Sequence, residues 1–214
     1  SAPRSRRPTA GPTSRWSTMG PFASPWGQAA NPNGAYDQVK VGMLKVYPPE
    51  KDARLDQTQT GKGGKALCWR QTDKIIGSHS SEGVNFAIRS YCPGFDICYA
   101  VTHIHSPNDR EILMAIGTDW WCNAYLNGKL VKSQIDPKSF AADACYFQRW
   151  KPIFATLKLK KGVNTLLVKN HGGSMNNWFV CYVSYQPDLR FTATPNADTP
   201  GRKVAATNDA ITTP

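Results

Sequence analysis

Two histidines have the spacing that most directly suggests chemistry. His103 and His105 stand two positions apart in ICYAVTHIHS, residues 97–106, a stretch that alternates like a β-strand. Side chains two residues apart on a strand project from the same face, so this pair could share a metal ion such as zinc. The sequence offers no third ligand at a comparable spacing, and two half-exposed strand histidines explain the same pattern. We therefore predict no metal site.

The sequence patterns of common enzyme classes are absent. The chain has no G-x-S-x-G nucleophile elbow, no P-loop and no H-E-x-x-H zinc motif. A glycosidase needs two carboxylates in one cleft, and nothing in the sequence singles out Glu50, Glu82 or Glu111 for that role. We expect no enzymatic activity and no cofactor.

The cysteines indicate the compartment. They form an even set of six without a CxxC pair, which argues against a zinc ribbon and favours an oxidising environment. Cys92 and Cys98 enclose only Pro-Gly-Phe-Asp-Ile, a separation that a disulfide can close. We predict this bond and leave open the pairing of Cys68, Cys122, Cys145 and Cys181. The expected location is extracellular or at the cell surface.

The net charge of +11 does not indicate nucleic-acid binding. The basic residues are dispersed, and no helix-turn-helix, RNP-like or zinc-finger pattern accompanies them. Their one concentration is at the start of the chain, at Arg4, Arg6, Arg7 and Arg15, which suits an acidic partner surface or an anionic glycan. No apolar run reaches the roughly 18 residues needed to span a bilayer.

The central elements are expected in EILMAIGTDWWCNAYLNGKLV, residues 111–131. An apolar run is broken at Gly117–Asp119, resumes at Trp121–Leu126 and reaches the dipeptide Asn127-Gly128. This dipeptide accepts positive φ at both central positions of a type I′ turn, so the chain returns antiparallel through Lys129. The pattern predicts a buried meander of strands.

Similar short strand patterns recur along the chain with almost no helical periodicity, which predicts an all-β jelly-roll sandwich. Strand-like stretches include residues 39–47, 66–69, 84–88, 153–159, 163–169 and 178–185, and one helical turn is expected at 136–144. We expect the core to include Trp69, Trp121, Tyr125, Leu166 and Trp178. Composition divides the chain into an extended N-terminal arm (1–35), the jelly roll (36–188) and an extended C-terminal tail (189–214).

Several segments together resemble the galactose-binding-like or PA14-like jelly rolls that accompany bacterial glycoside hydrolases and other cell-surface proteins. These segments are WSTMGPF (16–22), YPPE (47–50), GTD (117–119), YLNGK (125–129), LKLKKGVNTLLVK (157–169) and the Trp-Phe pair at 178–179. The resemblance covers roughly residues 16–185. It is more specific for fold than for function.

The resemblance also implies candidate sugar-binding residues. PA14-like sugar binders place two adjacent acids before the strand ending in NGK, where they hold calcium and sugar hydroxyls. Here Asp119 is followed by Trp120, so the second acid is missing and a calcium site is in doubt. Trp120 could stack on a sugar ring. Asn170, His171 and Ser174 lie where these folds often present ligand loops.

Two functions follow from these observations. The first is an exported structural subunit that assembles head to tail with copies of itself, with its arms added as strands to a neighbouring subunit. Its anchors would be the apolar residues of the arms: Trp16, Phe22, Trp26, Phe191, Val204 and Ile211. The alternative is a carbohydrate-binding module of a secreted glycan-processing system. We prefer assembly on sequence grounds.

Overall fold

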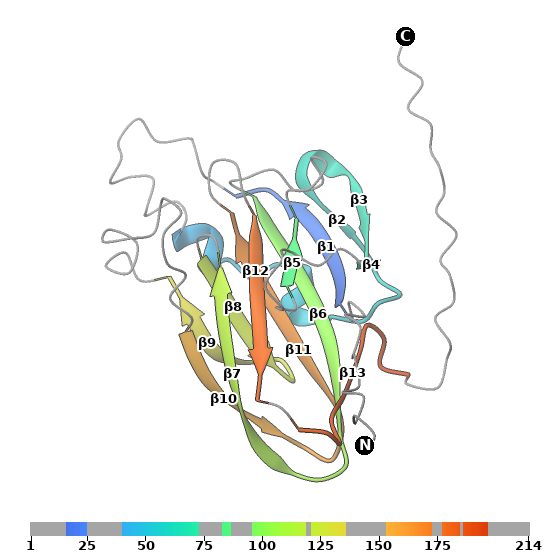
Figure 1. Cartoon of the computed structure of the whole chain (residues 1–214). Helices are drawn as coiled ribbons and strands as arrows, with labels where there is room; N and C mark the ends of the chain where they lie inside the picture. Colours follow the sequence, from blue (N-terminus) through green and yellow to red (C-terminus); the bar gives the residue numbers. More distant parts are fainter. Residues whose placement is uncertain are drawn as a thin grey trace, which may run out of the picture.

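The computed structural model describes residues 16–24, 40–72, 83–86, 96–118, 121–135, 153–172, 177–184 and 186–196. Within these ranges the chain forms two facing antiparallel β-sheets with little helix, so the fold is the all-β sandwich that the sequence predicts (Figure 1). Several predicted residues lie outside these ranges: Trp26, Cys92, Asp119, Trp120, Cys145, Ser174, Val204 and Ile211, together with the helical turn at 136–144. The Cys92–Cys98 bond therefore stays a prediction.

The larger sheet has the strand order β4-β1-β6-β11-β8-β9, and β13 also pairs with β6. Its strands are β1 (Trp16–Phe22), β4 (Arg70–Thr72), β6 (Ile97–Ser106), β8 (Trp121–Leu126), β9 (Lys129–Gln134), β11 (Gly162–His171) and β13 (Arg190–Thr192). The long strands β6 and β11 pair over ten residues, from Gly162 opposite Ser106 to His171 opposite Ile97. They form the centre of the sheet.

The smaller sheet has the order β10-β7-β12-β5 and lies in front of the larger one in Figure 1. Its strands are β5 (Gly83–Asn85), β7 (Arg110–Thr118), β10 (Ile153–Leu159) and β12 (Trp178–Val183). A separate hairpin pairs β2 (Thr58–Thr60) with β3 (Ala66–Cys68) around the short 3-10 turn η1 (Lys62–Gly64). The short helix α2 (Pro48–Lys51) precedes this hairpin.

The main core lies between the two sheets, and we call it the inter-sheet core. Alternate residues of each strand meet there, as the period of a strand requires. Leu166 and Val168 of β11 face Met114 of β7 and Phe179 of β12 in one buried cluster. Trp16 packs edge-on against Phe179, with ring centroids 5.1 Å apart. Burial of these apolar side chains is the main stabilising term of the sandwich.

The β8–β9 hairpin confirms the predicted turn. Asn127 has φ of 49° and Gly128 has φ of 76°, so both central positions are left-handed, and Leu126 lies opposite Lys129. The predicted meander is wrong, however, because β7 pairs with β10 and β12 in the smaller sheet while β8 pairs with β11 and β9 in the larger one. The chain changes sheets between these two strands. An apolar run alone does not reveal such a crossing.

Residues 39–47 were predicted to be a strand, and this is also wrong, because residues 40–44 are helical. Met43 and Tyr47 are buried, whereas Val41, Leu44 and Val46 are more than half exposed. Within the turn, Val41 and Leu44, three positions apart, share the solvent side, as a helix allows and the period of two of a strand does not. The strand prediction relied on β-branched residues such as Val41 and Val46, but these side chains are exposed to solvent and pack in no sheet.

The predicted arms contribute strands to this chain's own sandwich. β1 pairs with both β4 and β6, and Trp16 and Phe22 are 4% and 2% exposed. β13 pairs with the end of β6, and Phe191 packs against the inter-sheet core. Residues 16–22 and 190–192 therefore belong to the sandwich, and the predicted boundaries at 35 and 189 need correction there. Trp16, Phe22 and Phe191 are not free anchors for a neighbouring subunit.

The predicted core residues are confirmed in part. Trp69, Trp121 and Leu166 are buried. Tyr125 and Trp178 are only half-buried. Among the described helices, none is long and apolar enough to cross a membrane.

Candidate functional site

A segment that we call the cover, residues 40–69, packs on the face of the larger sheet that points away from the smaller sheet. Met43, Tyr47 and Trp69 of the cover join Tyr99 of β6 and Leu167 of β11 in a second apolar cluster. We call this cluster the cover core. The larger sheet therefore has both of its faces buried, which explains why eight consecutive residues of β6 are buried.

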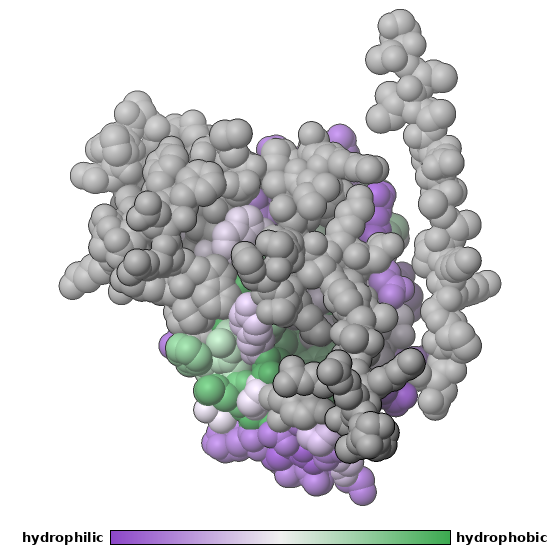
Figure 2. Space-filling view, viewed as in Figure 1, coloured by the Kyte–Doolittle hydropathy of each residue, from purple (hydrophilic) through white to green (hydrophobic). Residues whose placement is uncertain are grey.

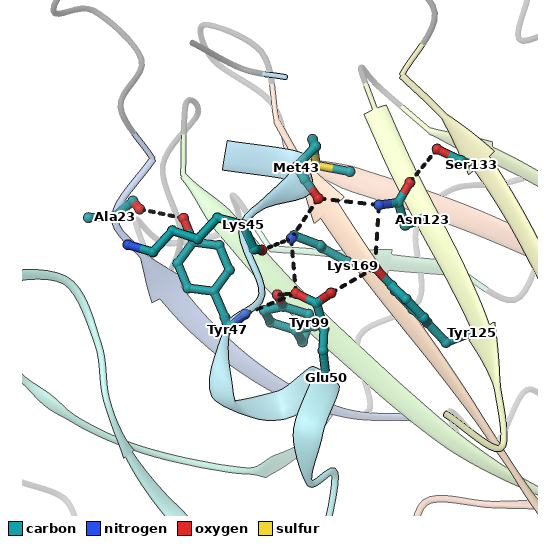
Figure 3. Close-up of polar contacts among 10 residues, drawn as sticks. All are labelled: Ala23, Met43, Lys45, Tyr47, Glu50, Tyr99, Asn123, Tyr125, Ser133 and Lys169. Carbon is teal, nitrogen blue, oxygen red and sulfur yellow. Dashed lines mark hydrogen bonds and ion pairs between the residues drawn. The ribbon is translucent and has the colours of Figure 1, made fainter. Parts of the chain in front are cut away.

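Lys169 of β11 joins the sheet to the cover. Its side chain is fully buried, and its Nζ donates to the backbone carbonyls of Met43 and Lys45 at 2.8 and 2.6 Å and to Glu50 Oε1 at 2.9 Å (Figure 3). An ammonium group has three hydrogens to donate, so these three acceptors satisfy it. The Nζ also lies 4.9 Å from the centre of the Tyr47 ring. Burial lowers the pKa of Lys169, and the Glu50 carboxylate opposes that shift.

Glu50 collects hydrogen bonds from both the sheet and the cover (Figure 3). Its Oε1 accepts from the hydroxyl of Tyr99 and from the backbone N–H of Tyr47, and its Oε2 accepts from the hydroxyl of Tyr125 at 2.7 Å. Burial, with Glu50 nearby, raises the pKa of Tyr99 and Tyr125 well above the usual value. Both phenols therefore stay protonated and can donate to the carboxylate. We call Lys169, Glu50, Tyr99 and Tyr125 the clamp.

The sequence explains why Glu50 turns inward. Pro48 and Pro49 occupy the first positions of α2, where the missing N–H costs nothing. Glu50 follows at the third helical position, where a glutamate side chain can reach back to the N–H of the residue before the helix, as it does to Tyr47 at 3.1 Å. The signal YPPE was visible in the sequence, but we did not assign a role to Glu50 or Lys169 from it.

An open groove lies between residues 49–56 of the cover and the larger sheet. Its volume is about 640 Å³. The cover contributes residues 49–56, the sheet contributes His103, Thr165 and Leu167, and the remaining lining residues are Asn127, Gly128, Pro195 and Asn196. His103 lies directly opposite Thr165 in the β6–β11 register, so these two form part of the floor.

The rim of the groove carries charged groups that are already paired in part. Arg54 contacts Asp52 through Nη2 at 2.7 Å and through Nε at 2.8 Å, and both side chains are exposed. The hydrogen bond from Arg54 lowers the pKa of Asp52. Asp56 and Lys51 lie on the same rim. The groove therefore presents hydrogen-bond donors and acceptors together with the apolar side chains of Leu55 and Leu167.

The two histidines that the sequence paired as possible metal ligands lie on the same strand but have different surroundings. His105 Nε2 lies 2.8 Å from the hydroxyl of Thr192 on β13. His103 is 4% exposed, and its Nδ1 has no hydrogen-bond partner among the described residues. Burial lowers the pKa of His103, and the backbone of Thr192 opposes this. In the described part of the chain, no three His, Cys, Asp or Glu side chains gather as a metal site would require.

Two predicted sugar-binding residues, Asn170 and His171, are fully buried. Asn170 Nδ2 donates to Asn177 Oδ1 at 2.6 Å and its Oδ1 accepts from the hydroxyl of Thr118, so it links the two sheets. His171 lies 3.0 Å from the hydroxyl of Ser24, and burial lowers its pKa to about 4. Both side chains support the sandwich and present no polar atom to solvent. Their burial does not favour direct contact with a glycan, and their predicted role in sugar binding stays an untested prediction.

A second surface feature lies on the outer face of the smaller sheet. Phe154 of β10 and Tyr182 of β12 both lie opposite Ala115 of β7, which places two aromatic side chains in one row across three strands. Phe154, Leu113 and Tyr182 are 55%, 49% and 38% exposed. Figure 2 shows apolar residues gathered on this face, with a hydrophilic margin below it. Nothing in the described residues indicates what this face contacts.

No protein-family profile matches the chain, and no curated protein matches it in sequence. Solved structures with a similar fold include a family 35 carbohydrate binding module from an environmental isolate, with 14% identity, 57% of this chain and 85% of that one covered, and a TM-score of 0.38. Another is the C-terminal domain of EclA, a sugar-binding protein, with 15% identity, 69% and 98% coverage, and a TM-score of 0.30.

A third similar structure is a β-glucosidase from Kluyveromyces marxianus in complex with glucose. It has 14% identity and a TM-score of 0.42; the match covers 61% of this chain but only 15% of the glucosidase. All three TM-scores lie below 0.5, so these similarities assign neither a family to the chain nor a role to individual residues.

Proposed function

We propose that this chain is a non-enzymatic carbohydrate-binding module and that the groove binds the sugar. The observation that carries the proposal is the groove of about 640 Å³, whose lining combines apolar side chains with exposed charged ones. The ring of His103 forms part of its floor but is buried, and it has hydrogen bonds with the backbone of Thr192 and Ala193. His103 therefore shapes the floor, and the exposed side chains of Arg54 and Asp56 are the ones placed to contact a ligand.

The mixed character of the lining supports a sugar in particular. Leu55, Leu167 and Pro195 offer apolar contact area, and Arg54 and Asp56 offer a donor and an acceptor on the rim. Ligand sites generally combine apolar walls with a few placed polar groups. A saccharide ring matches this combination, because its C–H faces are apolar and its hydroxyls lie at its edge.

The charge of the groove favours a neutral sugar over an acidic one. Lys51 and Arg54 supply two positive charges on the lining, and Asp52 and Asp56 supply two negative charges, so these four sum to zero. The remaining charged lining residue, Glu50, is paired with Lys169. A strongly anionic glycan would gain no net attraction at this site.

The state of the carboxylates supports binding without hydrolysis. Both oxygens of Glu50 already accept hydrogen bonds, and Asp52 is paired with Arg54. Asp56 is the remaining carboxylate among the described lining residues. A glycosidase requires two carboxyl groups that act on one bond. This arrangement supports binding without hydrolysis, and we place such a module outside the cell or on its surface, within a glycan-processing system, as part of the same proposal.

Self-assembly through the arms is not the function that these residues favour. Trp16, Phe22 and Phe191 pack within their own chain, and the other anchors of that hypothesis lie outside the described residues.

A glycan array followed by isothermal titration calorimetry tests the proposal. The full-length protein should bind a neutral glycan, and Arg54→Ala and Asp56→Ala should each weaken binding about tenfold, since each removes about one good hydrogen bond to the ligand. Lys160→Ala is the matched control for Arg54→Ala, because it also breaks an exposed ion pair, with Asp109 at 2.8 Å, away from the groove. The proposal fails if no glycan binds, or if binding is unchanged in both groove variants.

A further inference from the structure

We propose that Glu50 and Lys169 are positioning residues whose buried ion pair holds the wall of the groove in place. The inference rests on the proposed function only for the ligand of the groove; the holding role of the ion pair does not depend on it. It assigns the pair a local role, namely to fix residues 43–56 of the cover on the larger sheet. The alternative is that the pair contributes to the stability of the whole sandwich without a local effect.

Every hydrogen bond of the Lys169 ammonium crosses from the sheet to the cover. Its three acceptors, the carbonyls of Met43 and Lys45 and the Glu50 carboxylate, all belong to the cover, whereas Lys169 itself belongs to β11 (Figure 3). None of these bonds is made within the sheet. Their loss would leave β11 paired with β6 and β8 as before, and would release the cover instead.

Glu50 is held from three adjacent strands. Tyr99 comes from β6, Lys169 from β11 and Tyr125 from β8, and these strands are neighbours in that order. Three charge-assisted hydrogen bonds that converge from three directions fix the position of a carboxylate closely, because such bonds are short and directional. Glu50 therefore has one defined place above the sheet, and α2 with it.

The groove wall continues directly from this fixed point. Residues 49–56 line the groove, and Asp52 and Arg54 follow Glu50 by two and four positions. Beyond Glu50, the apolar contacts of this stretch with the cover core are those of the half-buried Ala53 and Leu55. Few apolar contacts and an exposed rim are the features of a segment that opens locally at low cost. The clamp supplies the constraint that this stretch lacks.

Hydrogen exchange measured by mass spectrometry on the full-length protein without ligand tests this role. Lys169→Met leaves the Glu50 charge buried without its partner, which is strongly unfavourable. We expect the amides of residues 43–56 to exchange about tenfold or more faster, while the amides of β7 and β12 keep their wild-type rates. Adding Glu50→Gln to Lys169→Met should bring the exchange back toward wild type, because no unpaired charge then remains in the cover core.

Lys158→Met is the matched control. Lys158 also pairs with a glutamate, Glu111, at 3.2 Å, but these side chains are 79% and 61% exposed, and an exposed pair contributes little. This variant should exchange like wild type throughout. If Lys169→Met does not fold, Tyr125→Phe replaces it, since it removes one donor from Glu50 Oε2 and should produce a smaller rise in the same residues.

The outcomes separate the clamp from the proposed function. Faster exchange confined to residues 43–56 supports the clamp whether or not any glycan binds. Unchanged exchange there, an equal rise in all strands, or no recovery in the double variant overturns it, even if the wild type binds sugar. Where a glycan does bind, Lys169→Met should also weaken its affinity about tenfold and Lys158→Met should not, because only the first moves the rim.

Discussion

The inter-sheet core and the cover core bury opposite faces of the same sheet with different kinds of groups. On β11, Leu166 and Val168 enter the inter-sheet core, whereas Leu167 and Lys169 point toward the cover. The first contact is apolar, and apolar burial is strong but non-directional. The second adds an ion pair and phenol hydroxyls, whose hydrogen bonds have fixed geometry. We infer that the inter-sheet core stabilises the sandwich, and that the cover core fixes the position of the cover on the larger sheet.

The largest expected effect on stability comes from a substitution in the inter-sheet core. Phe179→Ala removes a fully buried ring that packs against Trp16 and Phe86. Such a cavity should lower the free energy of unfolding by about 3–5 kcal/mol, measured by urea denaturation.

Phe154→Ala is the matched control for this change, since Phe154 belongs to the same sheet and is 55% exposed. Its effect should stay within about 0.5 kcal/mol. Similar losses from both variants would contradict the assignment of the core to the space between the sheets.

The next effect concerns His171, on the cover side of the larger sheet, where its ring lies 5.5 Å from that of Trp121. Burial lowers its pKa from 6.5 to about 4. Between these pH values the unfolded chain binds a proton at this position and the folded chain does not, so stability should fall as the pH drops from about 6.5 to about 4. The shift corresponds to a loss on the order of 3 kcal/mol.

Urea midpoints at several pH values, for wild type and His171→Gln, measure this loss. The variant should show a shallower dependence on pH in that window, whatever its absolute stability. An unchanged dependence would mean that His171 has the same pKa in the folded protein as in the unfolded chain, and the burial of this end of β11 would then need revision.

The sandwich could be predicted from the sequence because its signals are local. The dipeptide Asn127-Gly128 specifies a turn by itself, and the strands near 153–159, 163–169 and 178–185 alternate in the expected way. Strand pairing across sheets is not local, which is why β7 and β8 were wrongly placed in one meander. From composition, β1 was predicted to be part of the N-terminal arm. Its few apolar residues do not indicate a strand by themselves, and the strand forms through pairing with β4 and β6.

The candidate site was missed for a physical reason of the same kind. Lysine is rarely buried without a partner, so Lys169 in a strand reads as a surface residue. Its partner Glu50 lies 119 positions away, and no periodicity connects the two. By contrast, Asn170 and His171 were chosen because their positions resemble ligand loops, and the structure places them under other residues. In a strand that is buried on both faces, a polar side chain is held by a partner from another segment, as Lys169 is by Glu50.

The smallest expected effect tests the directional bonds of the cover core. Tyr99→Phe keeps the ring in the apolar cluster and removes only the hydroxyl that donates to Glu50. A hydrogen bond to a charged group contributes about 1.5–3 kcal/mol, so the free energy of local opening of residues 43–56, measured by hydrogen exchange, should fall by about that much in the variant. Tyr182→Phe is the matched control, because Tyr182 is partly exposed on the smaller sheet, and it should lose much less. Equal effects of the two variants would show that the Tyr99 hydroxyl contributes no more stability than the Tyr182 hydroxyl. The cover core would then hold its segment by apolar contact alone, as the inter-sheet core holds the two sheets.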